Sequence, residues 1–348
     1  MKKLIYLDNA ATTKTAPEVV EAMLPYFTEY YGNPSSVYEF SSHSKEAIAK
    51  SRETIAASLG AKADEIYFTA GGSESDNWAL KATAEAYAGK GNHIITTKIE
   101  HHAILHTGEY LEKRGFEVTY LDVDENGVVK LDELKKAIRP TTILISVMYA
   151  NNEIGTIQPI KEIGEIAHEH GILFHTDAVQ AYGQLPINVD ECHIDMLSSS
   201  GHKLNGPKGI GFLYIRKGVK IRSFIHGGAQ ERKRRAGTEN VPGVAGFGAA
   251  VKEMYTDHAE KIQKLIGLKD YMTDRLGEIE GTVINSKKGE ASAPQIVSVS
   301  FEGVRSEVLL HALEDKGIYV SSGSACSSNH PGISGTLKGI GVKDSLLD

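Results

Sequence analysis

The sequence predicts an α/β protein with a three-layer, mostly parallel, seven-stranded sheet, followed by a smaller α+β part. Over the first two-thirds of the 348 residues, short apolar segments alternate with longer segments in which apolar residues recur every three or four positions. Several of the short segments are apolar on both faces, which is typical of parallel strands covered by helices. After about residue 245 this alternation ends, and the chain predicts a second kind of structure.

The elements of the sheet part follow in a regular order. The predicted strands are Ile66–Thr69, His93–Thr97, Val118–Leu121, Ile143–Tyr149, Ile172–Thr176, Met196–Ser199 and Gly211–Ile215. The predicted helices are Pro17–Tyr30, Ser44–Leu59, Glu74–Ala88, His102–Arg114 and Ile160–His170. Right-handed connections between parallel strands place such helices on both faces of a sheet.

The last hundred residues predict an α+β arrangement. A long helical segment runs from Val244 to Leu276. A half-buried antiparallel strand, a helix closed by a glycine and a short strand follow at Gln295–Phe301, Ser306–Lys316 and Ile318–Val320. We therefore expect a large domain over residues 15–250 and a small domain formed by residues 1–14 and 251–348.

Composition and charge exclude several classes of protein. The 38 basic and 45 acidic residues give a net charge of −7, which disfavours a nucleic-acid binder. Only two cysteines are present, Cys192 and Cys326, too few for a disulfide scaffold or a cysteine-rich metal fold. The longest strongly apolar stretch is far shorter than a membrane span, and the apolar run after Met1 is too short for a signal peptide. We expect a soluble cytoplasmic protein that does not bind a membrane.

Two polar clusters end neighbouring predicted strands. Lys203 closes the segment Ser199-Ser200-Gly201-His202-Lys203, whose small residues allow the amine to be desolvated, as a Schiff-base lysine requires. Asp177 ends another strand, and the carboxyl ends of strands in open α/β sheets meet at one crevice. A lysine can bond the aldehyde carbon of pyridoxal phosphate, and a carboxylate can hold the ring nitrogen protonated. The two residues together therefore predict a pyridoxal phosphate site. The alternatives are a surface lysine in a glycine turn and an aspartate that caps a helix.

A third cluster lies between a strand and a helix, in Ala70-Gly71-Gly72-Ser73. Small residues let a phosphate approach the N–H groups at a helix N-terminus, and Ser73 adds a hydroxyl. The spacing of a nucleotide P-loop is absent, and an ordinary turn with a helix cap is the alternative.

Histidines follow another strand, in Ile99-Glu100-His101-His102. The sequence has no His-Glu-x-x-His motif and no cysteine near these residues, so we expect no intrinsic metal site. A histidine at a strand end is instead suited to stack on a planar cofactor or to shuttle protons.

The serine-rich segment Ser321–Ser328 surrounds Cys326 with polar residues. A free cysteine is usually a buried apolar residue, and we expect this of Cys192. Cys326 has no apolar flanks, so its thiol is available as a nucleophile or sulfur carrier. A cysteine–histidine hydrolase is disfavoured because no oxyanion motif or orienting residue accompanies this cysteine.

Taken together, these segments resemble a cysteine desulfurase of the NifS/IscS type, a class-V aminotransferase-like pyridoxal phosphate enzyme of fold type I. The resemblance covers nearly the whole chain. Its motifs are, in order, Tyr6–Thr12, Gly32–Ser36, Glu100–Ala103, Asn151–Gly155, His175–Gln180, Ser200–Lys203 and Arg235–Thr238. The segment Ser-Ser-Gly-Ser-Ala-Cys resembles the long loop of the subgroup that serves general iron–sulfur assembly.

The resemblance implies roles around the cofactor. Lys203 forms the Schiff base and moves a proton, Asp177 pairs with the ring nitrogen, and Gln180 bonds the ring hydroxyl. His101 stacks on the ring and serves in proton transfer. The residues implied to hold the phosphate are Gly72, Ser73, Ser200 and His202, with Thr238 from the second subunit of a homodimer.

The resemblance also implies how substrate and sulfur are handled. Asn33 and Asn152 bind the substrate L-cysteine, and Asn152 also lies by the cofactor ring. Cys326 takes the sulfur as a persulfide while L-alanine is released, and the sulfur passes to an iron–sulfur scaffold or another acceptor protein. The same cysteine is the residue that would reach an iron–sulfur cluster shared with a partner.

The family pattern continues past Asp348 with a Ser-x-x-Arg-Phe-Ser-type segment, whose arginine clamps the substrate carboxylate. From the sequence we expect either a piece of a longer protein or a chain that binds cysteine weakly, because a bidentate arginine clamp is hard to replace. Two other functions share these residues. One is a selenocysteine lyase or cysteine sulfinate desulfinase, and the other is a catalytically impaired scaffold of the sulfur machinery.

Overall fold

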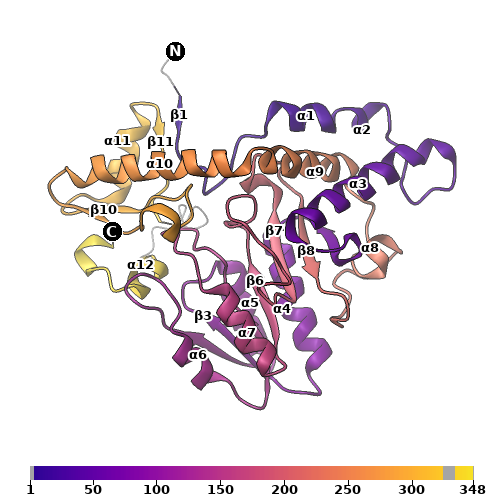
Figure 1. The fold of residues 1–348 in the computed structure, drawn as a ribbon, viewed down its shortest axis with the longest axis horizontal. Helices are drawn as coiled ribbons and strands as arrows, with labels where there is room; N and C mark the ends of the chain where they lie inside the picture. The colour runs from indigo at the N-terminus through magenta and orange to yellow at the C-terminus, as the bar shows by residue number, and fades with distance from the viewer. Residues whose placement is uncertain (1–3, 324–333, 348) are drawn as a thin grey trace.

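The computed structural model describes residues 4–323 and 334–347. Its centre is a seven-stranded sheet in the order β2-β8-β7-β6-β5-β3-β4, shown in Figure 1. The strands are β2 (Ile66–Thr69), β3 (His93–Thr97), β4 (Glu117–Leu121), β5 (Thr142–Ser146), β6 (Leu173–Asp177), β7 (Met196–Ser200) and β8 (Gly211–Ile215). Only β8 runs antiparallel to its neighbours within this sheet. The predicted mostly parallel sheet of seven strands is confirmed.

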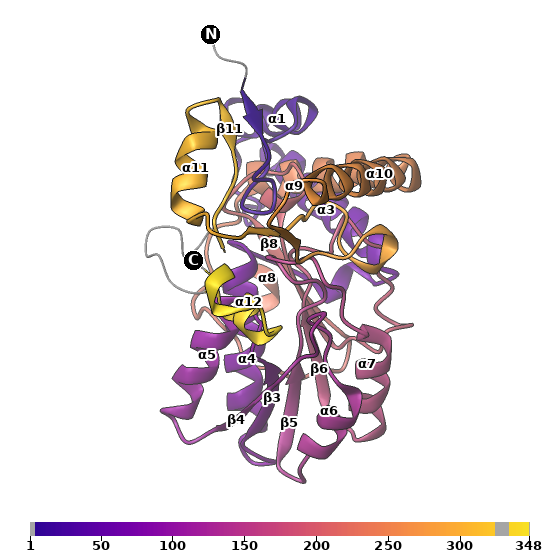
Figure 2. The same ribbon diagram turned by 90° about the vertical axis from the view of Figure 1, so that its left-hand side faces the viewer.

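Helices cover both faces of the sheet, as Figure 2 shows. On one face lie α4 (Gly72–Tyr87) and α5 (His102–Glu112), and on the other lie α6 (Leu131–Ala137) and α7 (Ile160–Glu169). Every residue of β2, β3, β5, β7 and β8 is buried, because these strands have a helical layer or another part of the chain on each side. The edge strand β4 is partly exposed.

The core has two parts that correspond to these two faces. One part contains the buried Trp78 of α4 together with Ile94 and Leu213 from the sheet. The other contains Phe174, Phe212 and many further apolar residues, against which α3 (Ser42–Leu59) and α9 (Val241–Tyr255) also pack. The sheet is therefore held rigidly from both sides, which fixes the ends of its strands.

A strand near the start of the chain pairs with one from its last part, beside the central sheet. β1 (Ile5–Tyr6) pairs in parallel with β11 (Ile318–Tyr319), and β9 (Thr282–Ile284) pairs antiparallel with β10 (Val299–Phe301). This part also contains α10 (His258–Gly277), α11 (Ser306–Glu314) and α12 (Gly335–Gly339). The predicted antiparallel strand at 295–301 is present but shorter. The boundary predicted at residue 250 lies within α9, and the division into two domains stays a prediction.

Two predicted helices are each interrupted. The segment predicted from Val244 to Leu276 is two helices, because Thr256 is extended and Asp257 takes a left-handed conformation with φ 51°. The segment 17–30 divides into α1 (Pro17–Met23) and α2 (Pro25–Thr28). Pro25 has no N–H to continue the hydrogen-bond ladder, which explains this second break.

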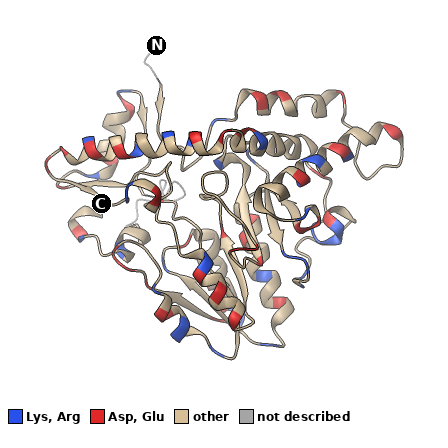
Figure 3. Cartoon of the chain, viewed as in Figure 1, with Lys and Arg blue, Asp and Glu red and all other residues tan. Residues whose placement is uncertain are grey.

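Short elements complete the chain. They are α8 (Gln230–Lys233) and the 3-10 turns η1 (Glu39–Ser41), η2 (Ala63–Glu65), η3 (Gly201–Lys203), η4 (Gly289–Ala291) and η5 (Asp344–Leu346). Figure 3 shows acidic and basic residues interspersed along the outer helices, while the central strands carry few charges. Among residues 4–323 and 334–347, no helix has both the length and the apolar character needed to cross a membrane.

Candidate active site

The start of α4 meets the ends of two sheet strands. A Cβ atom on Gly72 would lie 2.6 Å from Val179 Cγ2 and 3.8 Å from the Cβ of Ser200, so only glycine fits between them. Gly211 is equally confined, since a Cβ there would lie 2.4 Å from the carbonyl oxygen of Ser199. This close approach leaves the N–H groups at the N-terminus of α4 beside the ends of β6 and β7. A helix N-terminus of this kind is suited to bind an anion.

Lys203 lies in η3, directly after β7. Its Nζ donates hydrogen bonds to the carbonyl oxygen of Ala10 and, at 2.9 Å, to that of Ala11. Gln180 Nε2 also donates to the Ala10 carbonyl, at 2.9 Å. The backbone that follows β1 therefore binds the Lys203 amine and the Gln180 amide at the same carbonyl group, that of Ala10.

Asp177 is the last residue of β6 and is 5% exposed. Its Oδ1 accepts a hydrogen bond from the N–H of Val179 at 2.9 Å. Burial raises the pKa of Asp177, while its interactions with His101, the Val179 N–H and Lys203 act in the opposite direction. The carboxylate, the imidazole and the amine therefore face one another, as the sequence predicted for Asp177 and Lys203.

His101 is the N-cap of α5, and its Nδ1 accepts a hydrogen bond from the N–H of Ala103 at 3.1 Å. In the neutral ring this contact leaves the proton on Nε2. Burial lowers the pKa of His101, and Lys203 lowers it further, so the ring is neutral near pH 7. A neutral, half-buried imidazole with an Nε2 proton is suited to stack on a planar group and to donate a proton.

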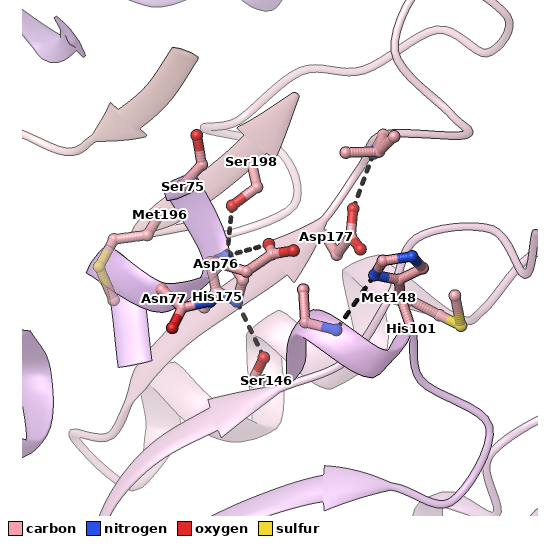
Figure 4. A network of polar contacts seen from close by, with 12 residues as sticks. Ser75, Asp76, Asn77, His101, Ser146, Met148, His175, Asp177, Met196 and Ser198 are labelled. Carbon is pink, nitrogen blue, oxygen red and sulfur yellow. Dashed lines mark hydrogen bonds and ion pairs between the residues drawn. The ribbon is translucent and has the colours of Figure 1, made fainter. Parts of the chain in front are cut away.

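A buried polar network lies behind Asp177, and Figure 4 shows it. His175, two residues before Asp177 on β6, bonds Ser146 of β5 at 2.8 Å and Ser198 of β7 at 3.0 Å. Asp76 of α4 lies 3.8 Å from His175 Nε2. Burial lowers the pKa of His175 to about 3, so this ring is neutral as well. The bonds of His175 join three strands, and Asp76 attaches α4 to them through a hydrogen bond with Ser198.

The comparisons with known proteins agree with this geometry. The family model described as aminotransferase class-V matches residues 5–339. The chain belongs to the class-V aminotransferase family. It is 56% identical over 345 residues to the cysteine desulfurase IscS of Methanosarcina thermophila, which covers 99% of this chain and 85% of that relative. The predicted membership of the cysteine desulfurase branch is thereby confirmed.

Two solved structures extend this likeness to three dimensions. A NifS-like protein has a TM-score of 0.93 and 40% identity, over 100% of this chain and 92% of its own. The structure of SspA in complex with cysteine has a TM-score of 0.85 and 37% identity, over 100% of this chain and 96% of its own. The fold of this class-V aminotransferase is thus that of NifS-like proteins.

The described residues fit pyridoxal phosphate. The glycine-lined start of α4 lies against Ser200 and suits a phosphate, and His202, two residues after Ser200, has its pKa lowered to about 4 by burial. The buried Asp177 suits a ring nitrogen, and the Lys203 amine suits an aldehyde carbon. This fit rests on the glycine cradle and on the kinds of group that line it.

The remaining predicted site residues lie at varied distances from this centre. Ser73 is exposed in the first turn of α4, and Asn152 is half-buried in the loop after β5. Asn33 and Thr238 are exposed, and Asn33 Oδ1 accepts a hydrogen bond from the N–H of Ser35 at 2.8 Å. Cys326 lies outside the described residues. The roles of all these residues stay predictions.

Several contacts at the site had no local signal in the sequence. Gln295 Nε2 donates to the carbonyl oxygen of Gln180 at 2.8 Å, from 115 residues further along the chain. The carbonyl groups of Ala10 and Ala11 act through the backbone, which leaves no trace in side-chain chemistry. Asp76 and Ser198 are polar residues in buried, otherwise apolar surroundings, and that pattern was the one available signal for the network behind Asp177.

Proposed function

We propose that the chain is a cysteine desulfurase that uses pyridoxal 5'-phosphate to convert L-cysteine into L-alanine, with Cys326 as the sulfur acceptor. The observation that carries the proposal is the convergence of Lys203, Asp177 and His101 beside the glycine-lined start of α4. The identity to a relative named cysteine desulfurase supports the same activity.

The cofactor, when bound, supplies the electron sink that stabilises a carbanion at the substrate. Asp177 would hold a proton on a facing ring nitrogen, and the Lys203 amine and the Val179 N–H favour the charged form of this carboxyl group against the effect of burial. Lys203 leaves the carbonyls of Ala10 and Ala11 and then takes and returns a proton at Nζ. His101 donates a proton from Nε2 while Nδ1 keeps the cap of α5.

The sulfur step belongs to Cys326. Its thiolate attacks the sulfur of the bound cysteine, a sulfur–sulfur bond forms, and the bond between that sulfur and the substrate carbon breaks. The electron pair of the broken bond stays on the carbon, which is protonated to give alanine. The persulfide on Cys326 then passes its outer sulfur to an acceptor protein, such as an iron–sulfur scaffold.

We propose that the enzyme is a homodimer, in which Thr238 of one subunit reaches the phosphate bound by the other. Large apolar side chains are exposed on α1, α2 and the loop after them, and exposed apolar surface of this extent supports a protein contact. They are Val20, Leu24, Phe27, Tyr31 and Val37. The sequence supports a cytoplasmic location for this dimer.

The test is the amount of alanine released per chain when the protein, loaded with pyridoxal phosphate, meets L-cysteine and dithiothreitol. We expect repeated turnovers. The Lys203→Ala variant should hold no cofactor that borohydride can fix to the polypeptide. The Cys326→Ala variant should keep the cofactor absorbance and lose persulfide formation.

Two results would overturn the proposal. Absence of alanine from a fully loaded wild-type dimer would favour a scaffold of the sulfur machinery. Faster turnover of selenocysteine or cysteine sulfinate than of L-cysteine would favour a selenocysteine lyase or a cysteine sulfinate desulfinase.

A further inference from the structure

Glu100 is a buried acid directly beside His101 that has no role in the proposed chemistry. It lies in the loop between β3 and α5 and is 5% exposed. Its Oε1 accepts two hydrogen bonds, one from Thr97 Oγ1 at 2.8 Å and one from the N–H of Met148 at 3.0 Å. Thr97 ends β3, whereas Met148 follows β5, so one carboxyl oxygen joins the ends of two neighbouring strands.

A second bond runs between the same two loops. Asn151 Nδ2 donates to the carbonyl oxygen of Ile99 at 3.0 Å. Residues 99 and 100 are therefore both attached to the loop that carries Met148 and Asn152. The position of His101 relative to that loop depends on these two bonds.

The other carboxyl oxygen of Glu100 shows which protonation state fits. Oε2 is buried and has no hydrogen-bond partner among residues 4–323 and 334–347. The charged form of a buried carboxyl group with an unpaired oxygen costs far more free energy than its neutral form. The pKa of Glu100 is raised to about 8, mainly by burial and in smaller part by the nearby Asp177, although the bonds from Met148 and Thr97 lower it, so the group is neutral near pH 7.

From this geometry we infer that Glu100 is a positioning residue for His101: as a neutral acid, it ties the His101 loop to the loop after β5 and so fixes the imidazole over the site. The inference rests on the proposed function, in which His101 donates a proton.

The test compares three variants of the full chain loaded with pyridoxal phosphate. Glu100→Gln keeps an acceptor oxygen and a neutral side chain. Glu100→Leu removes the acceptor and leaves the Met148 N–H and the Thr97 hydroxyl unpaired. Glu65→Leu is the matched control, since Glu65 is 7% exposed and accepts from the N–H groups of Lys62 at 2.8 Å and Lys217 at 2.7 Å, away from His101.

Two quantities are measured on each variant. The first is the rate of alanine formation as a function of pH. The second is the pKa of His101, from the ¹⁵N chemical shifts of its ring nitrogens, with the resonances assigned by their loss in His101→Gln. The second quantity does not require that the enzyme turns over.

We expect Glu100→Gln to match the wild type in both measurements. In Glu100→Leu, the ring is no longer held, so its pKa should rise toward about 6.5 and alanine formation should slow by about 10- to 100-fold. Glu65→Leu should lose stability but keep the His101 pKa. If Glu100→Leu does not fold, Glu100→Asp is measured instead, because its shorter side chain cannot reach the Met148 N–H.

Three results would overturn the inference. An unchanged His101 pKa in Glu100→Leu or Glu100→Asp would show that Glu100 does not position the ring. A rise of the His101 pKa in Glu65→Leu would show that a general loss of stability is enough to release the ring. An equal slowing of alanine formation in Glu100→Gln and Glu100→Leu would show that the charged acid is needed. If the wild type forms no alanine, the proposed function fails, yet the His101 pKa still decides this inference.

Discussion

Replacing Lys269 by methionine removes a buried amine from the helix that packs beside the site. Lys269 lies on α10 and is 2% exposed, and its Nζ donates to Ser292 Oγ at 2.8 Å and to the carbonyl oxygen of Ala293 at 2.9 Å. Burial lowers its pKa from the usual 10.5 to about 8, and the adjacent Asp270 offsets only part of this effect. The contact matters because the same loop carries Gln295, which bonds Gln180.

The sign of the pH effect follows from this lowered pKa. The unfolded chain holds the Lys269 proton up to about pH 10.5, whereas the folded chain holds it only up to about pH 8. The free energy of unfolding therefore rises with pH between these values, since folding no longer requires a buried charge. From the two pKa values, the free-energy penalty of the buried charge is about 3 kcal/mol at pH 7 and about 1 kcal/mol at pH 9.5.

The assay is urea unfolding followed by the fluorescence of Trp78, the single tryptophan, which is buried. Lys269→Met also loses two hydrogen bonds, but that loss does not vary with pH. The free energy of unfolding of the wild type minus that of Lys269→Met should therefore increase by about 2 kcal/mol from pH 7 to pH 9.5. Lys264→Met, on the exposed face of the same helix, should show no such increase. If the difference in free energy of unfolding between the wild type and Lys269→Met does not change from pH 7 to pH 9.5, the reasoning is refuted.

Three further substitutions test the site and its support. Gly72→Ala places a Cβ 2.6 Å from Val179 Cγ2, and we expect it to weaken cofactor binding about tenfold in an absorbance titration. Gly72→Ala with Val179→Ala should restore most of that affinity, and no recovery would contradict the steric explanation. Glu231→Gln breaks the bidentate pair with Arg52, whose two bonds are each 2.8 Å, and should lower the free energy of unfolding by about 3–5 kcal/mol in urea. Adding Arg52→Met to Glu231→Gln should restore much of the lost free energy of unfolding, and no recovery would show that the unpaired arginine is not the cause. Asp177→Asn should keep cofactor binding but slow alanine formation by about 100-fold or more, and an unchanged rate would remove the role given to this carboxylate.

The sequence by itself determined the layers of the fold and the strand ends that carry the chemistry. Apolar runs such as Ile66–Thr69 and Gly211–Ile215 are strands because they are buried on both faces, and burial of this kind is readable from composition alone. The same pattern placed Asp177 and Lys203 at the ends of neighbouring strands, and parallel strands bring such ends together.

Single residues in the sequence predict some helix boundaries and not others. Pro25 divides the first predicted helix, and this break could have been predicted because proline lacks the N–H that a helix needs. The break at Asp257, which takes a left-handed conformation before α10, was not predicted, because the apolar spacing on either side of it fits a single helix.

The tertiary structure alone decided which distant groups complete the site. The Ala10 carbonyl meets Lys203, 193 residues away, and Gln295 meets Gln180 across 115 residues. The Oε1 of Glu100 meets the N–H of Met148, which belongs to the next strand end in the sheet. These contacts use backbone groups or ordinary amide and acid side chains, whose partners depend on how the whole chain packs. The order of residues along the chain does not show how distant segments pack, so only the folded structure could show these contacts.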